Sequence, residues 1–428
     1  DMDAVSDGTV TVYATVSVGG SAYTTANYFV TQDTVVPTMT ITADIGVSGQ
    51  TTNDGSIDLT FTSSETTTDF IQGDITISGG SLSALAGSGQ TYTATLTPSG
   101  DATYSISVTQ GKFNDANGNP NAVSNTYQWS YDGTPPTMTI TADIGVTGQT
   151  TNDASIDLTF TSNEPTANFD INDIALSGGT LGGLGVTSTT IYTATFTPSG
   201  QGATSVSVAA GVFTDSGGTS NTVSNTYAWT FDSSSPTMTI TSTTVSSGDT
   251  SNDGTVAYVF TSNSPTTDFD ETDITETGGT WSAFTGVTTV KYTATFTPDG
   301  QGPTSVSVAA DAFTDAAGND NTVSNTFTWT YDSVGPTMTI TSGVGVSGQT
   351  TNDATIALTF TSSESTTNFE VGDITLNGGS IGALSGSGTT YTATFTPTTD
   401  GATDVSVAAS AFTDAAGNDN TVSNTFTW

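Results

Sequence analysis

Aspartates in predicted loops are the residues of this chain with the clearest capacity for chemistry. Three positions recur about every 100 residues: an Asp shortly after a late Trp, an Asp in an early "TND" or "SND" loop, and an Asp in a late "ND" or "TD" loop. Calcium takes about six to eight oxygens from such side chains, from backbone carbonyls and from water, with tolerant geometry. The candidate calcium ligands are Asp33, Asp54, Asp115, Asp132, Asp153, Asp215, Asp232, Asp253, Asp315, Asp332, Asp353 and Asp414.

A second interpretation of these residues stays open. Asp and Asn also occupy turns, where their side chains hydrogen-bond the backbone without any ion. The run "DANGNPN" from Asp115 begins like a calcium loop but lacks the Gly and Glu that this motif places later. The matching run in the second copy, "DSGGTSN", has lost two amides, which predicts a weaker site there. If calcium binds, we expect it where the Asp after the Trp meets a loop of the following domain.

Composition excludes most other chemistry. The chain has 2 Lys+Arg, 41 Asp+Glu, no His and no Cys, and a net charge of -39. Without His or Cys there is no base for a nucleophilic triad and no thiol, so we expect no enzyme, no catalytic residues and no organic-cofactor site. Nucleic acid is not an expected partner, because Lys112 and Lys291 are the only cations available to phosphates.

Location is predicted from the same composition. No apolar run approaches the roughly 18 residues needed to span a bilayer, so no membrane insertion is expected. The acidic surface and the richness in Thr, Ser, Gly and Asp suit an extracellular protein at a cell surface. The export signal is then expected outside this segment.

The elements that must position these aspartates belong to an internal repeat. The phrase "PTMTIT" begins at Pro37, Pro136, Pro236 and Pro336, and a late Trp recurs with the same period. Repeats of this kind indicate a tandem array of similar domains. The predicted domains are repeat 1 (37–135), repeat 2 (136–235), repeat 3 (236–335) and repeat 4 (336–428), preceded by residues 1–36 as the C-terminal strands of a partial domain.

Within a repeat, apolar residues alternate with polar ones over short runs bounded by turn-forming clusters. "SIDLTF", for example, places Ile57, Leu59 and Phe61 on one face, and "VSNTYQWSY" is predicted to align Val123 with Trp129. Period-two alternation is typical of antiparallel strands with one buried face. We therefore predict an all-β fold of tandem immunoglobulin-like β-sandwich domains, arranged end to end as an elongated rod, with each Trp in a core.

The residues also resemble a known family. The runs "FIQGDITISGGSLSAL", "YTATLTPSG" and "FNDANGNPNAVSNTYQW", with their counterparts in the later copies, resemble the bacterial immunoglobulin-like tandem repeats of large secreted surface adhesins. The resemblance covers residues 37–428 and implies a structural stalk with calcium-stiffened junctions. The partners it implies are neighbouring repeats of the same or identical chains, and a cell-surface or matrix ligand bound through regions outside this segment.

Two other functions remain open from sequence. Residues 1–36 are expected to belong to a longer chain whose repeats continue, but the same strands also permit a self-assembling filament in which another chain completes the partial domain. A carbohydrate-binding module is a weaker alternative. It depends on Trp281 and Phe284, aromatic residues that break the repeat pattern and are expected at the surface.

Overall fold

The computed structural model describes residues 8–24 and 27–428, and these contain β-strands and short 3-10 helices as their regular elements. The alternating apolar pattern thus forms strands, and the all-β prediction is confirmed. The chain divides into two compact units, one of residues 1–149 with 153–230 and the other of residues 150–152 with 231–428. None of the helices in the described ranges is long and apolar enough to cross a membrane.

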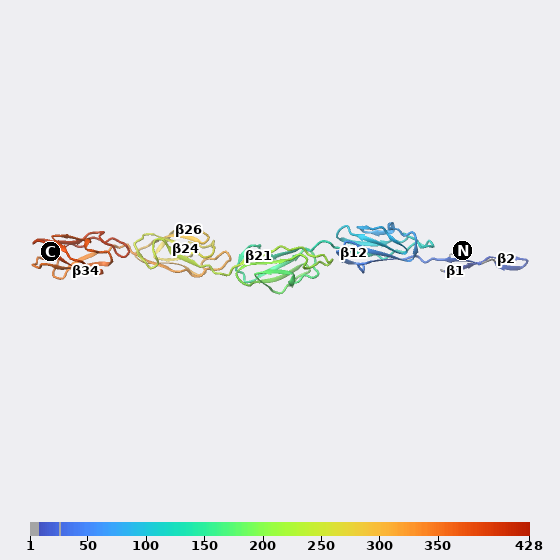
Figure 1. Ribbon diagram of the computed structural model, residues 1–428, viewed down its shortest axis with the longest axis horizontal. Helices are drawn as coiled ribbons and strands as arrows, with labels where there is room; N and C mark the ends of the chain where they lie inside the picture. The colour runs from blue at the N-terminus through green and yellow to red at the C-terminus, as the bar shows by residue number, and fades with distance from the viewer. Residues whose placement is uncertain (1–7, 25–26) are drawn as a thin grey trace. The chain divides into compact units, whose positions relative to one another are not determined.

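Repeat 1 forms a sandwich of two four-stranded sheets (Figure 1). Its elements are β5 (Met39–Ala43), β6 (Gln50–Thr52), β7 (Ile57–Thr67), the 3-10 helix η1 (Gln72–Asp74), β8 (Ile75–Ile77), β9 (Ser81–Leu82), β10 (Ala86–Thr97), β11 (Ala102–Val108) and β12 (Tyr127–Tyr131). The sheets have the orders β5-β7-β10-β9 and β6-β12-β11-β8. All neighbours are antiparallel except β6 and β12, which are parallel.

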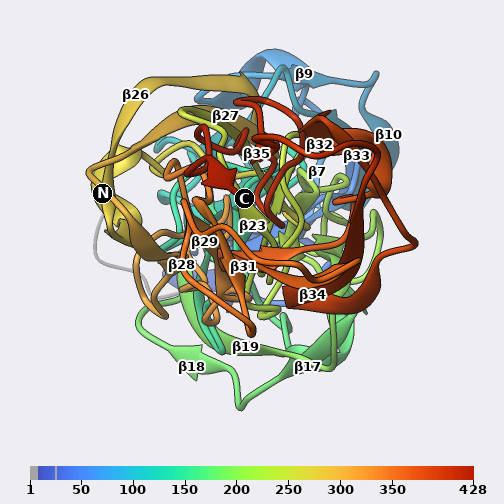
Figure 2. The same cartoon turned by 90° about the vertical axis from the view of Figure 1, so that its left-hand side faces the viewer.

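Repeat 2 repeats this plan. Its elements are β13 (Met138–Ala142), β14 (Thr150–Thr151), β15 (Ile156–Ser162), η2 (Ile171–Asp173), β16 (Ile174–Ser177), β17 (Gly179–Leu181), β18 (Gly185–Val186), β19 (Ile191–Pro198), β20 (Gly202–Val208) and β21 (Tyr227–Phe231). One sheet has the order β13-β15-β19-β17, and β21, β20 and β16 are neighbours in the other. Figure 2 shows β17 and β18 on the same side as β19, with which both pair.

Repeats 3 and 4 again form two sheets each. Repeat 3 contains β22 (Met238–Ser242), β23 (Thr250–Ser251), β24 (Val256–Ser262), η3 (Glu271–Asp273), β25 (Ile274–Thr277), β26 (Gly279–Thr288), β27 (Lys291–Pro298), β28 (Gly302–Val308) and β29 (Phe327–Tyr331). Repeat 4 contains β30 (Met338–Ser342), β31 (Ile356–Thr366), η4 (Val371–Asp373), β32 (Ile374–Asn377), β33 (Gly379–Ile381), β34 (Ser385–Pro397), β35 (Asp404–Val407) and β36 (Phe426–Thr427). The orders are β22-β24-β27-β26 with β23-β29-β28-β25, and β30-β31-β34-β33 with β32-β35-β36.

Each repeat has its own apolar core between its two sheets. In repeat 1, Leu59 and Phe61 from one sheet and Ile106 and Trp129 from the other are fully buried in one cluster. The predicted burial of the Trp is confirmed in repeats 1 to 3, where the exposed fraction of Trp129, Trp229 and Trp329 is at most 2%. Large buried aromatic side chains dominate the energy of such cores, so repeats 1 to 3 each have the means to fold around their own Trp, whereas Trp428 of repeat 4 is only partly buried.

The predicted partnership of Val123 with Trp129 is wrong. Val123 is 65% exposed, and the strand begins only at Tyr127. The preceding segment is held by side chains instead: Oδ1 of Asn125 accepts the N–H of Ile41 at 2.7 Å, and its Nδ2 donates to the Ile41 carbonyl at 2.9 Å. An Asn side chain thus replaces a strand neighbour here, which breaks the alternation before the strand starts.

Trp281 and Phe284 are part of the core of repeat 3. Both are half-buried and pack against its buried cluster. Trp281 contacts Tyr258 edge-on with ring centroids 5.4 Å apart, and Phe284 stacks on Tyr292 at 5.9 Å. The indole N–H of Trp281 donates to Glu276 at 3.0 Å. These rings therefore do not form the open platform that a sugar ring would need, and the carbohydrate-binding alternative loses its support.

The described part of residues 1–36 forms a hairpin with an open apolar face. β1 (Gly8–Val12) pairs with β4 (Tyr28–Gln32), and β2 (Thr15–Val18) pairs with β3 (Ser21–Thr24). The register that places Val10 opposite Val30 matches the one that places Tyr104 opposite Trp129 in repeat 1. The assignment of this segment to a partial domain stays a prediction, and residues 1–7 and 25–26 lie outside the described residues.

Candidate metal centre

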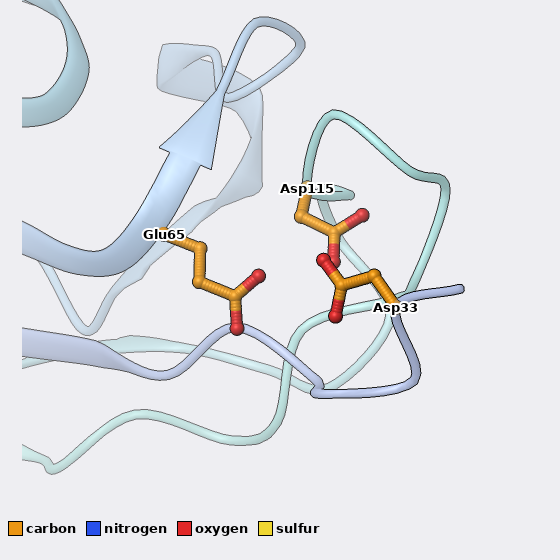
Figure 3. Close-up of side chains that lie close together, drawn as sticks. All are labelled: Asp33, Glu65 and Asp115. Carbon is orange, nitrogen blue, oxygen red and sulfur yellow. The ribbon is translucent and has the colours of Figure 1, made fainter. Parts of the chain in front are cut away.

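Among the residues that the structure describes, three groups of carboxylates lie close together, one in each of repeats 1, 2 and 4. Each group joins the Asp of the linker, a Glu near the end of a strand and the Asp of the late loop, with one oxygen of each residue within 4.8 Å of the others. Figure 3 shows the first group, in which the three carboxylates point toward one another. The groups are Asp33, Glu65 and Asp115; Asp132, Glu164 and Asp215; and Asp332, Glu364 and Asp414.

We call the region around each such group a repeat head, named after the repeat that supplies the strand and the late loop. The repeat-3 head is incomplete, because Ser264 stands at the position that Glu164 occupies in repeat 2. Its aspartates are Asp232 and Asp315, and Asn319 donates both to the carbonyl of Asp232 at 2.9 Å and to the carboxylate of Asp315. The repeat-3 head therefore keeps the same loop contacts with one carboxylate fewer.

The core positions the late loop of each head. In repeat 1, Phe113 is fully buried and packs edge-on against Phe70, two residues before Asp115. Asn121, also fully buried, closes the loop: its Oδ1 accepts the N–H of Phe113 at 3.0 Å, and its Nδ2 donates to the Thr109 carbonyl at 3.0 Å. Asp115 is thereby fixed by groups that cannot move without opening the core.

The strand-end Glu is positioned by a buried serine. Ser63 in β7 is 2% exposed, and its hydroxyl accepts the N–H of Glu65 at 3.4 Å. The same contact recurs between Ser162 and Glu164 at 3.5 Å. The Glu side chain therefore leaves the strand toward the late loop at the same place in each complete head.

The linker is tied to the late loop at every head by a side chain four residues after the late Asp. Nδ2 of Asn119 donates to the carbonyl of Asp33 at 3.1 Å, and Oγ1 of Thr219 donates to the carbonyl of Asp132 at 2.9 Å. Asn319 and Asn418 make the same contact in the other repeats. The linker Asp is thus held beside the late Asp by a bond to its own backbone.

The preceding repeat also holds the linker. Oδ1 of Asp101, in the loop between β10 and β11, accepts the N–H of Gly133 at 2.8 Å, and its other oxygen accepts the hydroxyl of Thr134. These hydrogen bonds, that of Thr134 first, lower the pKa of Asp101. Oε1 of Gln301 accepts the N–H of Ser333 at 3.1 Å in the corresponding loop of repeat 3. Linker residues are therefore anchored on both sides.

The complete heads carry uncompensated negative charge. Burial, and then the charge of Asp132, raises the pKa of Glu164, and burial, followed by the charges of Asp215 and Asp101, raises the pKa of Asp132. Glu364 behaves in the same way beside Asp332 and Asp414. By contrast, hydrogen bonds from Asn119 and its neighbours outweigh burial and lower the pKa of Asp115.

The chemistry of these groups fits a hard divalent cation. The donors are carboxylate oxygens, and the chain contains neither His nor Cys. Calcium and magnesium prefer such oxygen ligands, whereas zinc favours nitrogen and sulfur. A cation here would neutralise carboxylates that otherwise repel one another at close range.

The structure brings together the linker and late-loop aspartates that the sequence singled out, but not the early-loop ones. The early-loop residues lie next to strand ends, where the N–H of Asp54 donates to Oγ1 of Thr52 at 3.4 Å and that of Asp253 to Oγ of Ser251 at 3.1 Å. As ligands they stay predictions: Asp54, Asp153, Asp253 and Asp353.

Sequence reasoning missed the strand-end glutamates. Their signal is a Glu two residues after the Ser of an "FTS" run in three of the four repeats, as at Glu65, Glu164 and Glu364. An isolated acid at a strand end looks like an ordinary solvated residue. It becomes a candidate ligand only when the late loop is seen to fold over it.

Comparison with known proteins identifies a family for the repeats. The model of a bacterial Ig-like domain matches residues 33–131, 132–230, 232–331 and 332–428. No curated protein matches the chain. Among solved structures, invasin, a bacterial integrin-binding protein, is 15% identical, with 92% of this chain and 79% of invasin covered at a TM-score of 0.36. InvD of Yersinia pseudotuberculosis is 14% identical, with 64% of this chain and 92% of InvD covered at a TM-score of 0.31.

Proposed function

Because the chain belongs to the bacterial Ig-like domain family, we propose that it is a non-enzymatic structural region of a long extracellular fibre or adhesin stalk, stiffened by calcium at its repeat heads. In this role, repeats act as spacers that hold a binding region away from a cell surface. The partners are then neighbouring repeats, with any cell-surface or matrix ligand bound by regions outside this segment.

Composition and repetition support a structural role. The chain offers no His and no Cys for general base or nucleophilic catalysis, and its acids recur in copies of one unit. A net charge of -39 favours solubility and keeps such domains apart outside the cell. The same charge makes close approach of acidic domain ends unfavourable unless a cation intervenes.

The observation that carries the calcium proposal is the recurrence of the three-carboxylate group at the linker. At the repeat-2 head, Asp132 comes from the linker, while Glu164 and Asp215 come from the body of repeat 2. An ion bound by all three carboxylates would tie the linker to the body of repeat 2. Since Asp101 of repeat 1 anchors the next linker residues, fixing the linker restricts the motion between the two repeats.

Calorimetry with chelator-treated full chain tests this proposal. Calcium is expected to bind and to raise the melting temperature, because a ligand selective for the folded state adds about 2.7 kcal/mol at 100 times its dissociation constant. Asp332→Asn is expected to remove one binding event, whereas the matched change Asp400→Asn, at an exposed acid in the loop between β34 and β35, is expected to leave binding unchanged. Absence of heat and of any melting shift at millimolar calcium contradicts the proposal.

A self-assembling filament is the second candidate, favoured by the hairpin that residues 8–24 and 27–32 form. Its apolar residues Val12 and Tyr28 are 47% and 74% exposed, although the residues at the corresponding positions of repeat 1, Ile106 and Tyr127, are buried. A strand surface of this kind is suited to completion by another chain. Analytical ultracentrifugation distinguishes the filament from the stalk. The filament requires assemblies whose size grows with protein concentration and which disappear when residues 1–32 are deleted.

A further inference from the structure

The four repeat heads differ in how many of their carboxylate oxygens are already occupied. In the repeat-1 head, Nδ2 of Asn117 donates to Oδ2 of Asp33 at 2.7 Å, and Nδ2 of Asn119 donates to Oδ2 of Asp115 at 2.8 Å. In the repeat-4 head, Nδ2 of Asn418 donates to Oδ2 of Asp414 at 3.0 Å. An incoming cation must displace or reorient these amides before it reaches the oxygens.

The repeat-2 head lacks the corresponding amide. Thr219 stands at the position of Asn119, and its hydroxyl is used on the carbonyl of Asp132. Oδ1 of Asp215 accepts the N–H of Thr219 at 2.9 Å, but its Oδ2 is buried and has no hydrogen-bond partner. Asp215 itself is only 2% exposed. A buried carboxylate oxygen without a partner is strongly unfavourable, and a cation in the group removes that penalty.

Glycine leaves space beside the same carboxylate. Gly217 occupies the position held by Asn117, Ala317 and Ala416 in the other repeats. A Cβ at Gly217 would lie 3.0 Å from Cβ of Asp132 and 3.2 Å from Oδ1 of Asp215. The absence of a side chain therefore leaves the linker and the late loop free to close around an ion without a steric conflict.

The repeat-3 head is the opposite case. Ser264 replaces the strand-end Glu, so two carboxylates remain. Nδ2 of Asn319 donates to both carboxylate oxygens of Asp315, at 3.4 and 3.2 Å. Oδ1 of Asp232 accepts the N–H of Ser234 at 3.0 Å. This head has the fewest carboxylates, and both oxygens of its late Asp already accept hydrogen bonds.

We infer that the heads bind calcium in a graded order, with the repeat-2 head loading first, the repeat-1 and repeat-4 heads next, and the repeat-3 head last. This inference rests on the proposed calcium function and adds to it a dependence on ion concentration. The number and charge of the ligands set calcium affinity over several orders of magnitude. The linker at Asp232 is then the last to be fixed by an ion as calcium rises.

The order reverses the expectation from sequence that the second copy is the weaker site. That expectation counted the amides of "DANGNPN" as ligands. In the structure these amides donate their N–H groups to the carboxylates, as Asn119 does to Asp115. Loss of an amide at Thr219 therefore frees a ligand oxygen.

Calcium titration of the full chain, followed by calorimetry and native mass spectrometry, tests the order with two reciprocal variants. Thr219→Asn restores the amide without changing any carboxylate, and it is expected to weaken the tightest site about tenfold. Ser264→Glu supplies the missing carboxylate to the repeat-3 head and is expected to strengthen the weakest site by a similar factor. Asn and Glu stand at these positions in other repeats, so both variants are compatible with the fold.

The outcomes separate the two claims. One tight site that Thr219→Asn weakens, together with a weak site that Ser264→Glu strengthens, supports the graded order. Equal affinities in the wild-type chain, or no response to both variants, overturn the order while leaving calcium binding intact. No binding of calcium to the wild-type chain overturns the proposed function itself. Asp400→Asn, which changes an exposed acid in the loop between β34 and β35, serves as the control and is expected to match wild type.

Discussion

Asn418 joins the linker of repeat 4 to its late loop, because its Nδ2 donates to the carbonyl of Asp332 at 2.9 Å and to Oδ2 of Asp414 at 3.0 Å. One amide therefore orients a backbone carbonyl and partly neutralises a buried carboxylate. Its counterparts in repeats 1 and 3 do the same. The order of the linker thus depends on side chains of the late loop even without an ion.

Replacing this amide is expected to destabilise repeat 4. Asn418→Ala leaves the Asp332 carbonyl and one oxygen of Asp414 without their donor, which costs about 1–3 kcal/mol for a partly buried contact with a charged group. Denaturant unfolding in chelator measures the loss. Asn377→Ala, which removes an exposed contact with Asp404, is the control and is expected to change stability little. Equal effects of the two variants contradict this role for Asn418.

The charge of the repeat-2 head predicts that the stability of the protein depends on both pH and calcium. Burial and Asp132 raise the pKa of Glu164 above its ordinary value of 4.5, so the folded protein binds that proton more tightly than the unfolded chain does. The contribution of Glu164 to stability is therefore fully present below 4.5 and is lost as pH rises through the raised pKa.

Glu164→Gln tests this relation because it removes the charge and keeps the shape. In chelator at neutral pH the variant is expected to melt higher than wild type, and the difference is expected to vanish in acid. With calcium present the order reverses, since wild type gains a ligand that the variant lacks. Glu271→Gln, an exposed acid of η3, controls for the loss of one charge. A Gln variant less stable than wild type in chelator at neutral pH argues against repulsion in this head.

Burial of the recurring Trp predicts a large core effect. Trp229→Ala is expected to lower the free energy of unfolding by about 3–5 kcal/mol through the cavity it leaves. Val223→Ala is the control, because Val223 is 66% exposed and its truncation creates no cavity. Denaturant melts of the two variants provide the comparison. A Val223 variant as damaging as the Trp229 variant contradicts this account and would revive the partnership rejected above for the corresponding residues of repeat 1, Val123 and Trp129.

Much of the fold was predictable because the same alternation of apolar and polar residues recurs in each repeat. Alternation in "SIDLTF" and "YTATLT" defines one buried face, and Leu59 and Leu96 are indeed fully buried. The alternation failed at Val123, because Asn125 and not a strand backbone binds Ile41. Period-two reasoning cannot anticipate a side chain that takes the place of a strand.

The candidate site was predictable only in part. Recurrence of Asp33 and Asp115 in loops marked two of three carboxylates of the first group, but Glu65 comes from a strand and joins them only through folding. The direction of the amide at Asn119, which donates to the carboxylate, is likewise invisible in sequence. Ligand counts from sequence alone therefore do not register which carboxylate oxygens the amides already occupy.

The central claim, that the repeats form a calcium-stiffened spacer, is tested most directly by small-angle X-ray scattering of the full chain with calcium and with chelator. Four domains of some 30–40 Å placed end to end give a rod of about 150 Å, with a radius of gyration near 40 Å. A calcium-stiffened spacer gives such a value with calcium and a broader, less extended distribution in chelator. A radius of gyration near 22 Å, expected for one compact globule of this length, or identical curves in both conditions, would contradict it.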